Sequence, residues 1–294
     1  TQILNINGTN APKELIMAQI AERVESLLAL YRSHGFKLTY FLGGETADLP
    51  DQVQSAVYDV SVFAEAEEAG LVKGNVQPGD QIYGLVSDGQ AIWEDSLNSG
   101  LMSNGLTLAW TYTMLERYGA DRPFLIRGNG SYKGCFAVTD KPEILQGMTV
   151  SQALLSPTRQ WAIFIRLLIE ELKMKGILNQ LHGISMNTGG GATKITHVGQ
   201  GILYTKEMPE PPPIFRFVQA ESGEKWRDMY RGLNCGVGID VVGEKSTRFA
   251  AALEQVSQAT GIKLYRLGEC GEAEGDANKV VLMTPYGVFD DYDK

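Results

Sequence analysis

Cysteine is scarce in this sequence of 294 residues. Its three cysteines, Cys135, Cys235 and Cys270, lie far apart and form neither a CxxC pair nor a Cys/His spacing. A zinc site and a disulfide framework are therefore not indicated. So few and so scattered cysteines are typical of a reducing compartment, and we expect a cytoplasmic protein.

Long apolar runs and an excess of positive charge are also missing. No apolar stretch approaches the ~20 residues that a membrane-spanning helix needs, and the N-terminus lacks a basic segment followed by an apolar one. Asp and Glu outnumber Lys and Arg by 35 to 26, which gives a formal net charge of -9. This acidic balance argues against nucleic acid or a membrane surface as a partner. Small-molecule chemistry becomes the expected class of function.

The length is roughly twice the ~150 residues of an ordinary domain, so two domains are expected. Apolar spacing predicts a helix over residues 11–34 that ends at Gly35, and short strands over 38–42 and 58–64. A glycine-containing linker then precedes a new strand at 81–87. We predict an N-terminal domain over residues 1–66 and a C-terminal α/β domain over 67–294, and the fold class is α+β.

The second predicted domain alternates helices with strands. A polar excursion over residues 88–102 separates its first strand from a helix predicted from Ser103 to about Tyr118. Ser156 is predicted to cap a further helix, because Ser is a good N-cap and Pro157 a good first residue. The remaining predicted elements are a helix with Trp226, Met229, Tyr230 and Leu233 on its buried face, a helix ended by Gly261, and strands over 263–267 and 280–284.

Glycine is abundant, with 33 residues. Because glycine has no Cβ, a glycine cluster lets backbone N–H groups converge on an anion, and a helix that begins just after the cluster adds partial positive charge. Two segments have this character, Gly189-Gly190-Gly191 and Ser103-Asn104-Gly105. Neither matches the spacing of a P-loop or of a dinucleotide-binding motif. A tight loop without a ligand is the alternative interpretation of the glycine triplet.

A third cluster, Gly43-Gly44-Glu45-Thr46, places a carboxylate directly after a predicted strand. Magnesium bound to nucleotide phosphates takes one or two carboxylates and completes its shell with water and phosphate oxygens. Nearby carboxylates, including Asp59, could share this role, and a solvated turn is the alternative. His182 and His197 bracket the glycine triplet, so a ligand role is open to them. No serine, histidine and acid set lies in a nucleophile-elbow context, so hydrolase chemistry has no support.

Seven segments in a fixed order carry a family resemblance. They are Gly43-Gly44-Glu45-Thr46-Ala47-Asp48-Leu49-Pro50, Tyr58-Asp59-Val60-Ser61, Gly79-Asp80, Ser103-Asn104-Gly105, Leu154-Leu155-Ser156-Pro157-Thr158-Arg159, Thr188-Gly189-Gly190-Gly191 and Met229-Tyr230-Arg231-Gly232-Leu233-Asn234-Cys235-Gly236-Val237-Gly238. Together they resemble the phosphoribosylformylglycinamidine cyclo-ligase family, also called aminoimidazole ribonucleotide synthetase. The first segment resembles this family more than its ATP-using superfamily relatives.

The resemblance implies a reaction and a set of ligands. In it, ATP phosphorylates the amide oxygen of formylglycinamidine ribonucleotide, an internal nitrogen attacks, and phosphate leaves as the imidazole ring of purine biosynthesis forms. It implies ATP and Mg²⁺ as cofactors and a homodimer of two-domain subunits with the synthetase fold. The nucleotide would be held by Gly43, Gly44, Glu45, Thr46 and Asp59, with Glu45 as the metal ligand. The phosphates of the substrate or of ATP would be held by Ser103, Asn104, Gly105, Thr188, Gly189, Gly190 and Gly191, and the proton-transfer groups are not identified.

Three departures from the family pattern accompany the resemblance. Met102 stands where the family has histidine, and the excursion over 88–102 is longer than the family's turn. The family's glycine-rich N-terminal segment, with its further metal-binding acids, has no counterpart here, and because the sequence opens inside an expected strand we expect residues upstream of Thr1. Two alternatives stay open. One is another ATP-using superfamily member, a synthase or small-molecule kinase, and the other is a non-catalytic protein that binds phosphate ligands.

Overall fold

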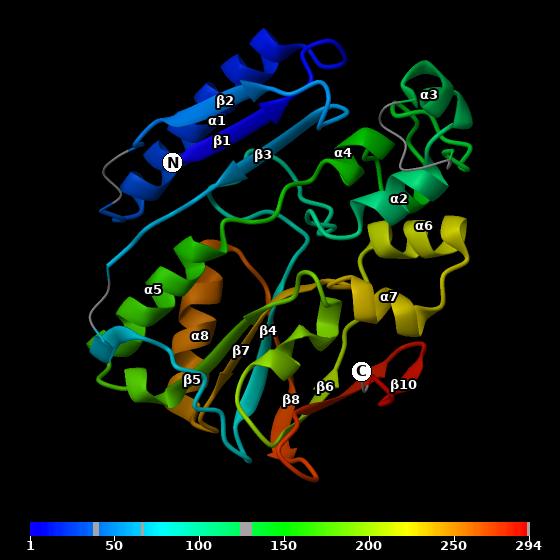
Figure 1. The fold of residues 1–294 in the computed structure, drawn as a ribbon. Helices are drawn as coiled ribbons and strands as arrows, with labels where there is room; N and C mark the ends of the chain where they lie inside the picture. The colour runs from blue at the N-terminus through cyan, green and yellow to red at the C-terminus, as the bar shows by residue number, and fades with distance from the viewer. Residues whose placement is uncertain (38–40, 66–67, 124–130, 293–294) are drawn as a thin grey trace. The chain divides into compact units, whose positions relative to one another are not determined.

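The structure, a computed structural model, describes residues 1–37, 41–65, 68–123 and 131–292 (Figure 1). The chain divides into two compact units, Thr1–Leu71 with Leu115–Tyr132, and Val72–Met114 with Lys133–Lys294. Each unit combines helices with a β-sheet, which confirms the predicted α+β class. The predicted boundary at 66/67 falls on residues outside the described part, so the division into domains 1–66 and 67–294 stays a prediction.

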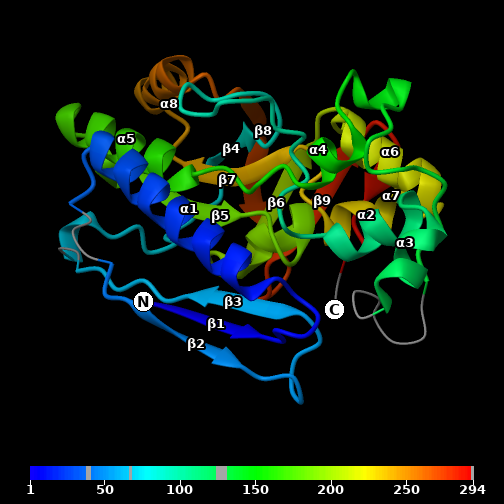
Figure 2. The ribbon, with the colours of Figure 1, turned by 90° about the horizontal axis from the view of Figure 1, so that it is seen from above.

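The first unit contains a three-stranded sheet in the order β2-β1-β3. The strands are β1 (Gln2–Ile6), β2 (Gly44–Asp48) and β3 (Ala56–Val60), and β1 pairs parallel with β2 and antiparallel with β3. Helix α1 (Lys13–Ser33) lies across one face of this sheet (Figure 2). Leu4 and Ile6 are buried on one face of β1, whereas Ile3, which points to the opposite face, is 50% exposed.

Several predictions for this unit were wrong in detail. Residues 38–40 of the predicted strand lie outside the described residues, while Phe41 and Leu42 are exposed and belong to no strand. The strand is instead Gly44–Asp48, which starts directly after Gly43, whose φ is +84°. The segment Gly44 to Thr46 is therefore paired with β1 and does not form a turn. Helix α1 confirms the predicted helix with ends that differ by one or two residues, but none of its residues is fully buried.

The second unit is built on a seven-stranded sheet in the order β10-β9-β6-β8-β4-β7-β5. Neighbouring strands are antiparallel except for the parallel pair of β6 and β9. The predicted strands over 81–87, 263–267 and 280–284 are all confirmed, with shifted ends. The strands are β4 (Gln81–Val86), β5 (Leu181–Met186), β6 (Ile202–Glu207), β7 (Val237–Gly243), β8 (Leu264–Glu272), β9 (Lys279–Thr284) and β10 (Gly287–Phe289).

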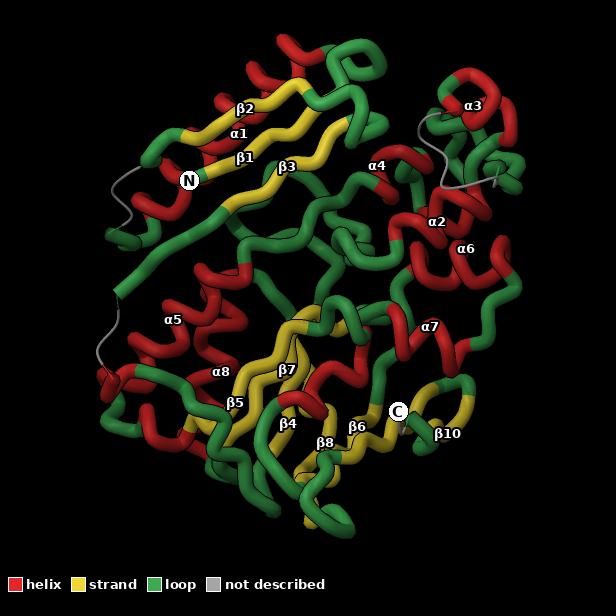
Figure 3. Tube along the Cα trace, in the orientation of Figure 1, coloured by secondary structure: helices red, strands yellow, loops and turns green. Residues whose placement is uncertain are grey.

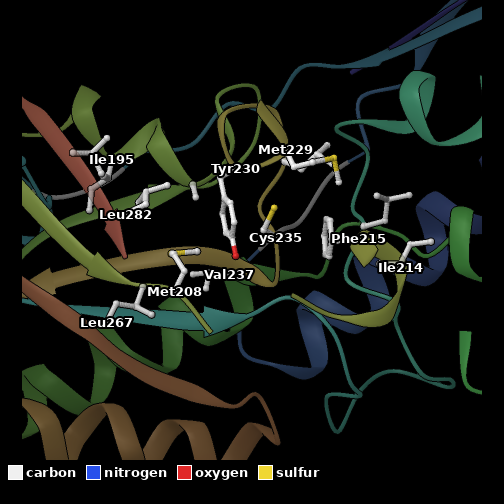
Figure 4. Packing of buried hydrophobic residues seen from close by; sticks show 14 of the residues in the cluster. Ile195, Met208, Ile214, Phe215, Met229, Tyr230, Cys235, Val237, Leu267 and Leu282 are labelled. Carbon is white, nitrogen blue, oxygen red and sulfur yellow. The ribbon is translucent and has the colours of Figure 1, made fainter. Parts of the chain in front are cut away.

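Helices cover both faces of this sheet. Alternation along β4 sends Tyr83 and Leu85 into the core beneath α5 (Trp161–Met174) and α8 (Thr247–Thr260), and Ile82 into the core on the other face. That second core is closed by α2 (Leu106–Thr113), α4 (Val150–Leu154), α6 (Pro213–Ser222) and α7 (Trp226–Gly232). Figure 4 shows Met229 and Tyr230 of α7 in this core beside Cys235 and Phe215, which confirms their predicted packing role.

Two predicted helices differ from the structure. The helix predicted from Ser103 to Tyr118 is broken, because Met114 has extended backbone (φ -82°, ψ 147°) between α2 and α3 (Glu116–Asp121). Ser156 does not cap a helix. Helix α5 begins only at Trp161, and the Ser156 Oγ instead accepts a hydrogen bond from the N–H of Ser99 at 3.0 Å.

The predicted polar excursion over residues 88–102 is a loop that includes a single bridge between Gly89 and Asn98 (Figure 3). Short 3-10 turns complete the element list, namely η1 (Glu68–Gly70), η3 (Glu143–Leu145), η4 (Leu178–Gln180) and η5 (Gly191–His197). None of the described helices is both long and apolar enough to cross a membrane.

Candidate active site

A cavity of about 1170 Å³ opens in the second unit, on the face of the sheet that carries α2 and α7. Asn104 and Gly105 line it from the start of α2, and Gly189 and Gly190 line it from the loop after β5. Two segments that the sequence singled out separately as phosphate cradles therefore meet at one cavity. Within these segments, Ser103, Thr188 and Gly191 do not line the cavity.

The end of α7 is the contact point at which these two segments meet. The Asn104 side-chain amide donates to the Gly232 carbonyl. A Cβ on Gly105 would lie 2.0 Å from the Leu233 side chain, and one on Gly191 would lie 2.4 Å from the Tyr230 carbonyl oxygen. The contact at Gly191 is with backbone, so glycine is required there, whereas at Gly105 glycine is favoured by the left-handed backbone, with φ +87°.

The loop between β5 and η5 has the geometry of an anion cradle. Gly189 and Gly191 have left-handed φ values of +63° and +53°, while Gly190 is extended. Within the described part of the chain, the N–H groups of Gly189 and Gly190 donate no hydrogen bond to another protein group. Two adjacent donors at the cavity wall are thus available to a ligand, which is the arrangement that binds phosphate oxygens.

Charged side chains line the same cavity. Arg231 and Lys279 contribute positive charge, and Glu224 and Asp228 contribute negative charge from the first part of α7 and the residues before it. Since Arg231 directly precedes the contact point at Gly232, the basic end of α7 is the one next to the glycine segments. In the sequence, Arg231 stands out only as part of a family motif, and Lys279 has no local signal.

The two histidines that bracket the glycine triplet have different environments. His197 lines the cavity at the end of η5. His182 does not line it, because its Nδ1 lies 2.7 Å from the Asp80 carboxylate in a mostly buried pair between β5 and the residue before β4. A ligand role in this cavity is therefore available to His197 and not to His182.

The loop before α2 is held by residues from other motifs. The buried Asn234 side chain donates to the Gly100 carbonyl at 3.0 Å and accepts from the Ser87 hydroxyl at 2.8 Å. The Ser103 N–H donates to the Thr158 hydroxyl at 3.3 Å. Arg159, also buried, pairs with Glu94 inside the excursion at 2.9 Å. The segments around residues 156–159 and 234 therefore hold the loop that leads into the Ser103 to Gly105 segment.

Met102, directly before this cradle, has a left-handed backbone conformation with φ +64° and is almost fully buried. For a residue with a Cβ this conformation costs about 1–2 kcal/mol. It persists because its neighbours on both sides are fixed, at Leu101 by Asn234 and at Ser103 by Thr158. Strain of this kind is concentrated at functional sites.

The predicted nucleotide and metal residues lie in the first unit. Glu45 on β2 and Asp59 on β3 are both opposite Ile3 of β1, so the two carboxylates point to the same open face of the sheet. Their strands are separated by β1, which places the backbones about 10 Å apart. Both residues are exposed, whereas Thr46 points to the other face together with Leu4. Among the described residues, no group of three or more His, Cys, Asp or Glu side chains could hold a metal ion.

Three curated proteins with related sequences carry the same name. The chain is 28% identical over 242 residues to phosphoribosylformylglycinamidine cyclo-ligase of Xanthomonas campestris pv. campestris (strain B100), covering 80% of this chain and 60% of that protein. The namesakes from Methanococcus maripaludis and Cupriavidus metallidurans are 26% and 29% identical, over 92% and 85% of this chain and 69% and 63% of theirs. The chain thus spans about 60% to 69% of the length of these relatives. No family model matches the chain.

Solved structures also align with most of the chain. The alignment with the hydrogenase maturation protein HypE covers 98% of this chain and 74% of that protein, with a TM-score of 0.49 and 14% identity. The alignment with thiamine-monophosphate kinase from Stenotrophomonas maltophilia K279a covers 95% of this chain and 71% of that protein, with a TM-score of 0.47 and 14% identity.

Proposed function

The chain is a sequence relative of the phosphoribosylformylglycinamidine cyclo-ligases, and on that premise we propose that it catalyses the ATP-dependent closure of formylglycinamidine ribonucleotide to aminoimidazole ribonucleotide. In this reaction the γ-phosphoryl group of ATP passes to the amide oxygen of the substrate. An internal nitrogen then attacks the activated carbon, and inorganic phosphate leaves as the ring closes. The products are aminoimidazole ribonucleotide, ADP and phosphate, which places the protein in purine biosynthesis.

The observation that carries this proposal is the meeting of two glycine segments at one cavity. Phosphoryl transfer depends mainly on positioning and on neutralising charge, so backbone donors and cations matter more than a nucleophilic triad. The N–H groups of Gly189 and Gly190 supply donors, and Arg231 and Lys279 supply positive charge at the same cavity. In our proposal this cavity holds the phosphate of the ribonucleotide substrate or the phosphates of ATP.

The proposed cofactors are ATP and Mg²⁺, with Glu45 as a magnesium ligand and Asp59 as a neighbouring carboxylate. Carboxylate oxygens are suitable ligands for Mg²⁺, which needs only one or two of them beside phosphates and water. Glu45 and Asp59 are exposed on one sheet face and therefore fit such a site. Bound magnesium would neutralise charge on the nucleotide phosphates, while Gly43, Gly44 and Thr46 would form the backbone around it.

We also propose a cytoplasmic homodimer. The sparse, isolated cysteines support a reducing compartment. The open face of the three-stranded sheet, which exposes Ile3 and Val57, supports an association through this sheet. Light scattering coupled to size-exclusion chromatography gives the mass in solution, and a mass of one chain would contradict the dimer.

Incubation of the protein with ATP, Mg²⁺ and formylglycinamidine ribonucleotide tests the proposed reaction. We expect equal amounts of ADP and aminoimidazole ribonucleotide, both measured by mass spectrometry, and no ADP without the substrate. ADP formed without aminoimidazole ribonucleotide would favour a synthase or kinase acting on another small molecule. Binding of phosphate without any turnover would favour a non-catalytic relative.

A further inference from the structure

A buried ion pair lies beneath the glycine loop and has no part in the proposed chemistry. Lys206 on β6 and Asp240 on β7 both have side chains that are 0% exposed, and their charged atoms are 2.6 Å apart. Burying two charges is costly, and an apolar pair of the same size is often as stable. A pair kept at such a cost calls for a role other than stability.

The ion pair crosses two strands of the sheet. Strands β8 and β4 lie between β6 and β7, so the Lys206 side chain must extend across them to reach Asp240. The residue opposite Lys206 on β8 is Gly268, and the residue opposite Asp240 on β4 is Gly84. Both cross-strand neighbours are glycines, and side chains of other residues pack closely over Gly84, where a Cβ would lie 2.7 Å from Leu267 and 2.8 Å from Val237.

Lys206 connects this pair to the candidate phosphate loop. Its ammonium also donates to the carbonyl of Ala192, at 2.9 Å. Ala192 is fully buried and directly follows Gly191, and its N–H donates to the Leu233 carbonyl at 3.2 Å. Both backbone polar groups of Ala192 are therefore fixed, the N–H by the residue after α7 and the carbonyl by the buried ammonium.

The other end of the loop is fixed from β7. The Asn187 N–H donates to the Gly238 carbonyl at 2.9 Å, and its side-chain amide donates to the Val237 carbonyl at 3.0 Å. Asp240 lies on the same strand. The strand that fixes the start of the loop thus also carries the carboxylate that holds Lys206 against its end.

We propose that Lys206, held in place by Asp240, is a positioning residue that fixes the backbone of the Gly189–Gly191 loop for an incoming phosphate. The proposal rests on the proposed function in one respect, that this loop receives phosphate. Lys206 does not touch the ligand and acts through the Ala192 carbonyl. Asp240 supplies the charge that keeps the ammonium in the interior.

The decisive variant is K206M/D240L, which replaces the ion pair by apolar side chains of similar size. A hydrogen bond from a charged donor is equivalent to about one to two orders of magnitude in an equilibrium constant. We therefore expect hydrogen exchange in residues 188–197 to become about tenfold faster or more, and the affinity for inorganic phosphate in calorimetry to fall about tenfold. Exchange in β4 serves as the internal reference and should keep its rate.

Two further variants control this experiment. D240N removes the charge that keeps the ammonium in the interior but keeps an oxygen acceptor for the lysine, so exchange of the loop should become faster, though less than in K206M/D240L. K175M/E171L removes another Lys–carboxylate pair of 2.6 Å, at the C-terminal end of α5 and away from the cavity lining, and should leave the loop unchanged. If K206M/D240L fails to fold, K206M/D240N compared with D240N isolates the loss of the Lys206 donor in a neutral background.

The outcomes separate this inference from the proposed function. Unchanged loop exchange in a folded variant that lacks Lys206 overturns the positioning role, whether or not phosphate binds. Faster loop exchange together with no phosphate binding by the unmodified protein supports the positioning role and contradicts the proposed phosphate site. Faster exchange with weaker phosphate binding supports both.

Discussion

Single glycines have different roles within the same loop. Gly191 is buried against the backbone of Tyr230 and Leu233, so it is needed for packing. Gly189 has the same left-handed conformation, but a Cβ there would meet no atom within 4 Å. The sequence marks both as glycine and cannot tell the packed position from the open one, because the difference lies in the distance to α7.

Substitution of these glycines by alanine should separate the two roles. We expect Gly191→Ala to lower the free energy of unfolding by about 3 kcal/mol, through strain and overpacking. Gly189→Ala should cost only about 1 kcal/mol, from the left-handed backbone. Urea titrations measure both changes. Gly147→Ala, at another open left-handed position outside the cavity lining, should match Gly189→Ala in stability but leave phosphate affinity unchanged.

Glu45 is the residue on which the proposed metal role depends. We expect Glu45→Gln to reduce ATP turnover by at least about 100-fold, as loss of a charged group that stabilises the transition state does. Circular dichroism should show an unchanged fold, because the side chain is exposed. Glu14→Gln, an exposed carboxylate in the first turn of α1, is the matched control. Activity of Glu45→Gln near that of this control would exclude the proposed role.

At the scale of elements, the loop between β4 and α2 is organised by a residue far away in sequence. Asn234 lies shortly before β7 and makes hydrogen bonds to Ser87, Gly100, Leu101 and Gly236. In the sequence, Asn234 is only one member of a family motif and has no predicted role. Its contacts come from three separate chain segments, so no local pattern could predict them.

Asn234→Ala should therefore loosen the loop as well as destabilise the protein. Removing the amide leaves buried backbone and hydroxyl groups without partners, and we expect a loss of about 2–4 kcal/mol in unfolding free energy by urea titration. Relative to the unmodified protein, the variant should show a larger increase in amide hydrogen exchange in peptides covering residues 98–105 than in peptides of α8. Thr149→Ala, which removes the capping box of α4, should cost about 1 kcal/mol without this local effect. An equal response of both regions would contradict the organising role of Asn234.

The turn between β9 and β10 is attached to α7 by aromatic stacking. Tyr286 stacks on Trp226 with ring centroids 3.9 Å apart, and its hydroxyl donates to Glu210 at 2.7 Å. Burial and the bond to Glu210 raise the pKa of Tyr286 to about 12 from the ordinary 10.0. The folded protein thus favours the neutral phenol, and this contribution to stability is complete below pH 10 and is lost as the pH rises toward 12.

An alkaline titration checks this attachment. Between pH 10 and 12 we expect the midpoint of urea unfolding to fall further in the unmodified protein than in Tyr286→Phe, which keeps the stacked ring but has no proton to lose. Both proteins contain other tyrosines with raised pKa values, so only the difference between them reports on Tyr286. Identical alkaline losses would show that the Tyr286 hydroxyl does not contribute.

At the scale of the whole molecule, the two units differ in how much they bury. In the second unit β4 and β7 are buried along their whole length, with a separate hydrophobic core on each face. In the first unit the described part of β1 buries Leu4 and Ile6, and α1 has no fully buried residue. Because buried apolar area dominates stability, most of the stability of this chain resides in the second unit.

We therefore expect the two units to open separately. Amides of β1 should exchange at least about 100-fold faster than those of β4 and β7, since local opening follows the local density of buried contacts. Hydrogen-exchange mass spectrometry of the 294-residue chain measures both regions at once. Equal protection would mean that the chain unfolds as a single cooperative unit.

The sequence alone determined the α+β class, the helices α1 and α8 with their glycine ends, three of the seven strands of the large sheet, and the glycine segments around 105 and 190. These features follow from periodicity and from the backbone freedom of glycine, which are local properties. It failed at Ser156, at Met114 and at Gly44, where contacts with distant segments override local propensity.

Only the tertiary structure decided which of these residues share a site. It brings Asn104 and Gly189 to one cavity at the end of α7, separates His182 from His197, and places the Lys206–Asp240 pair beneath the loop. The physical reason is that the order of strands in the sheet is fixed by the packing of both cores together. Which residues face one another across β6, β8, β4 and β7 is therefore a property of the assembled sheet and of no single segment.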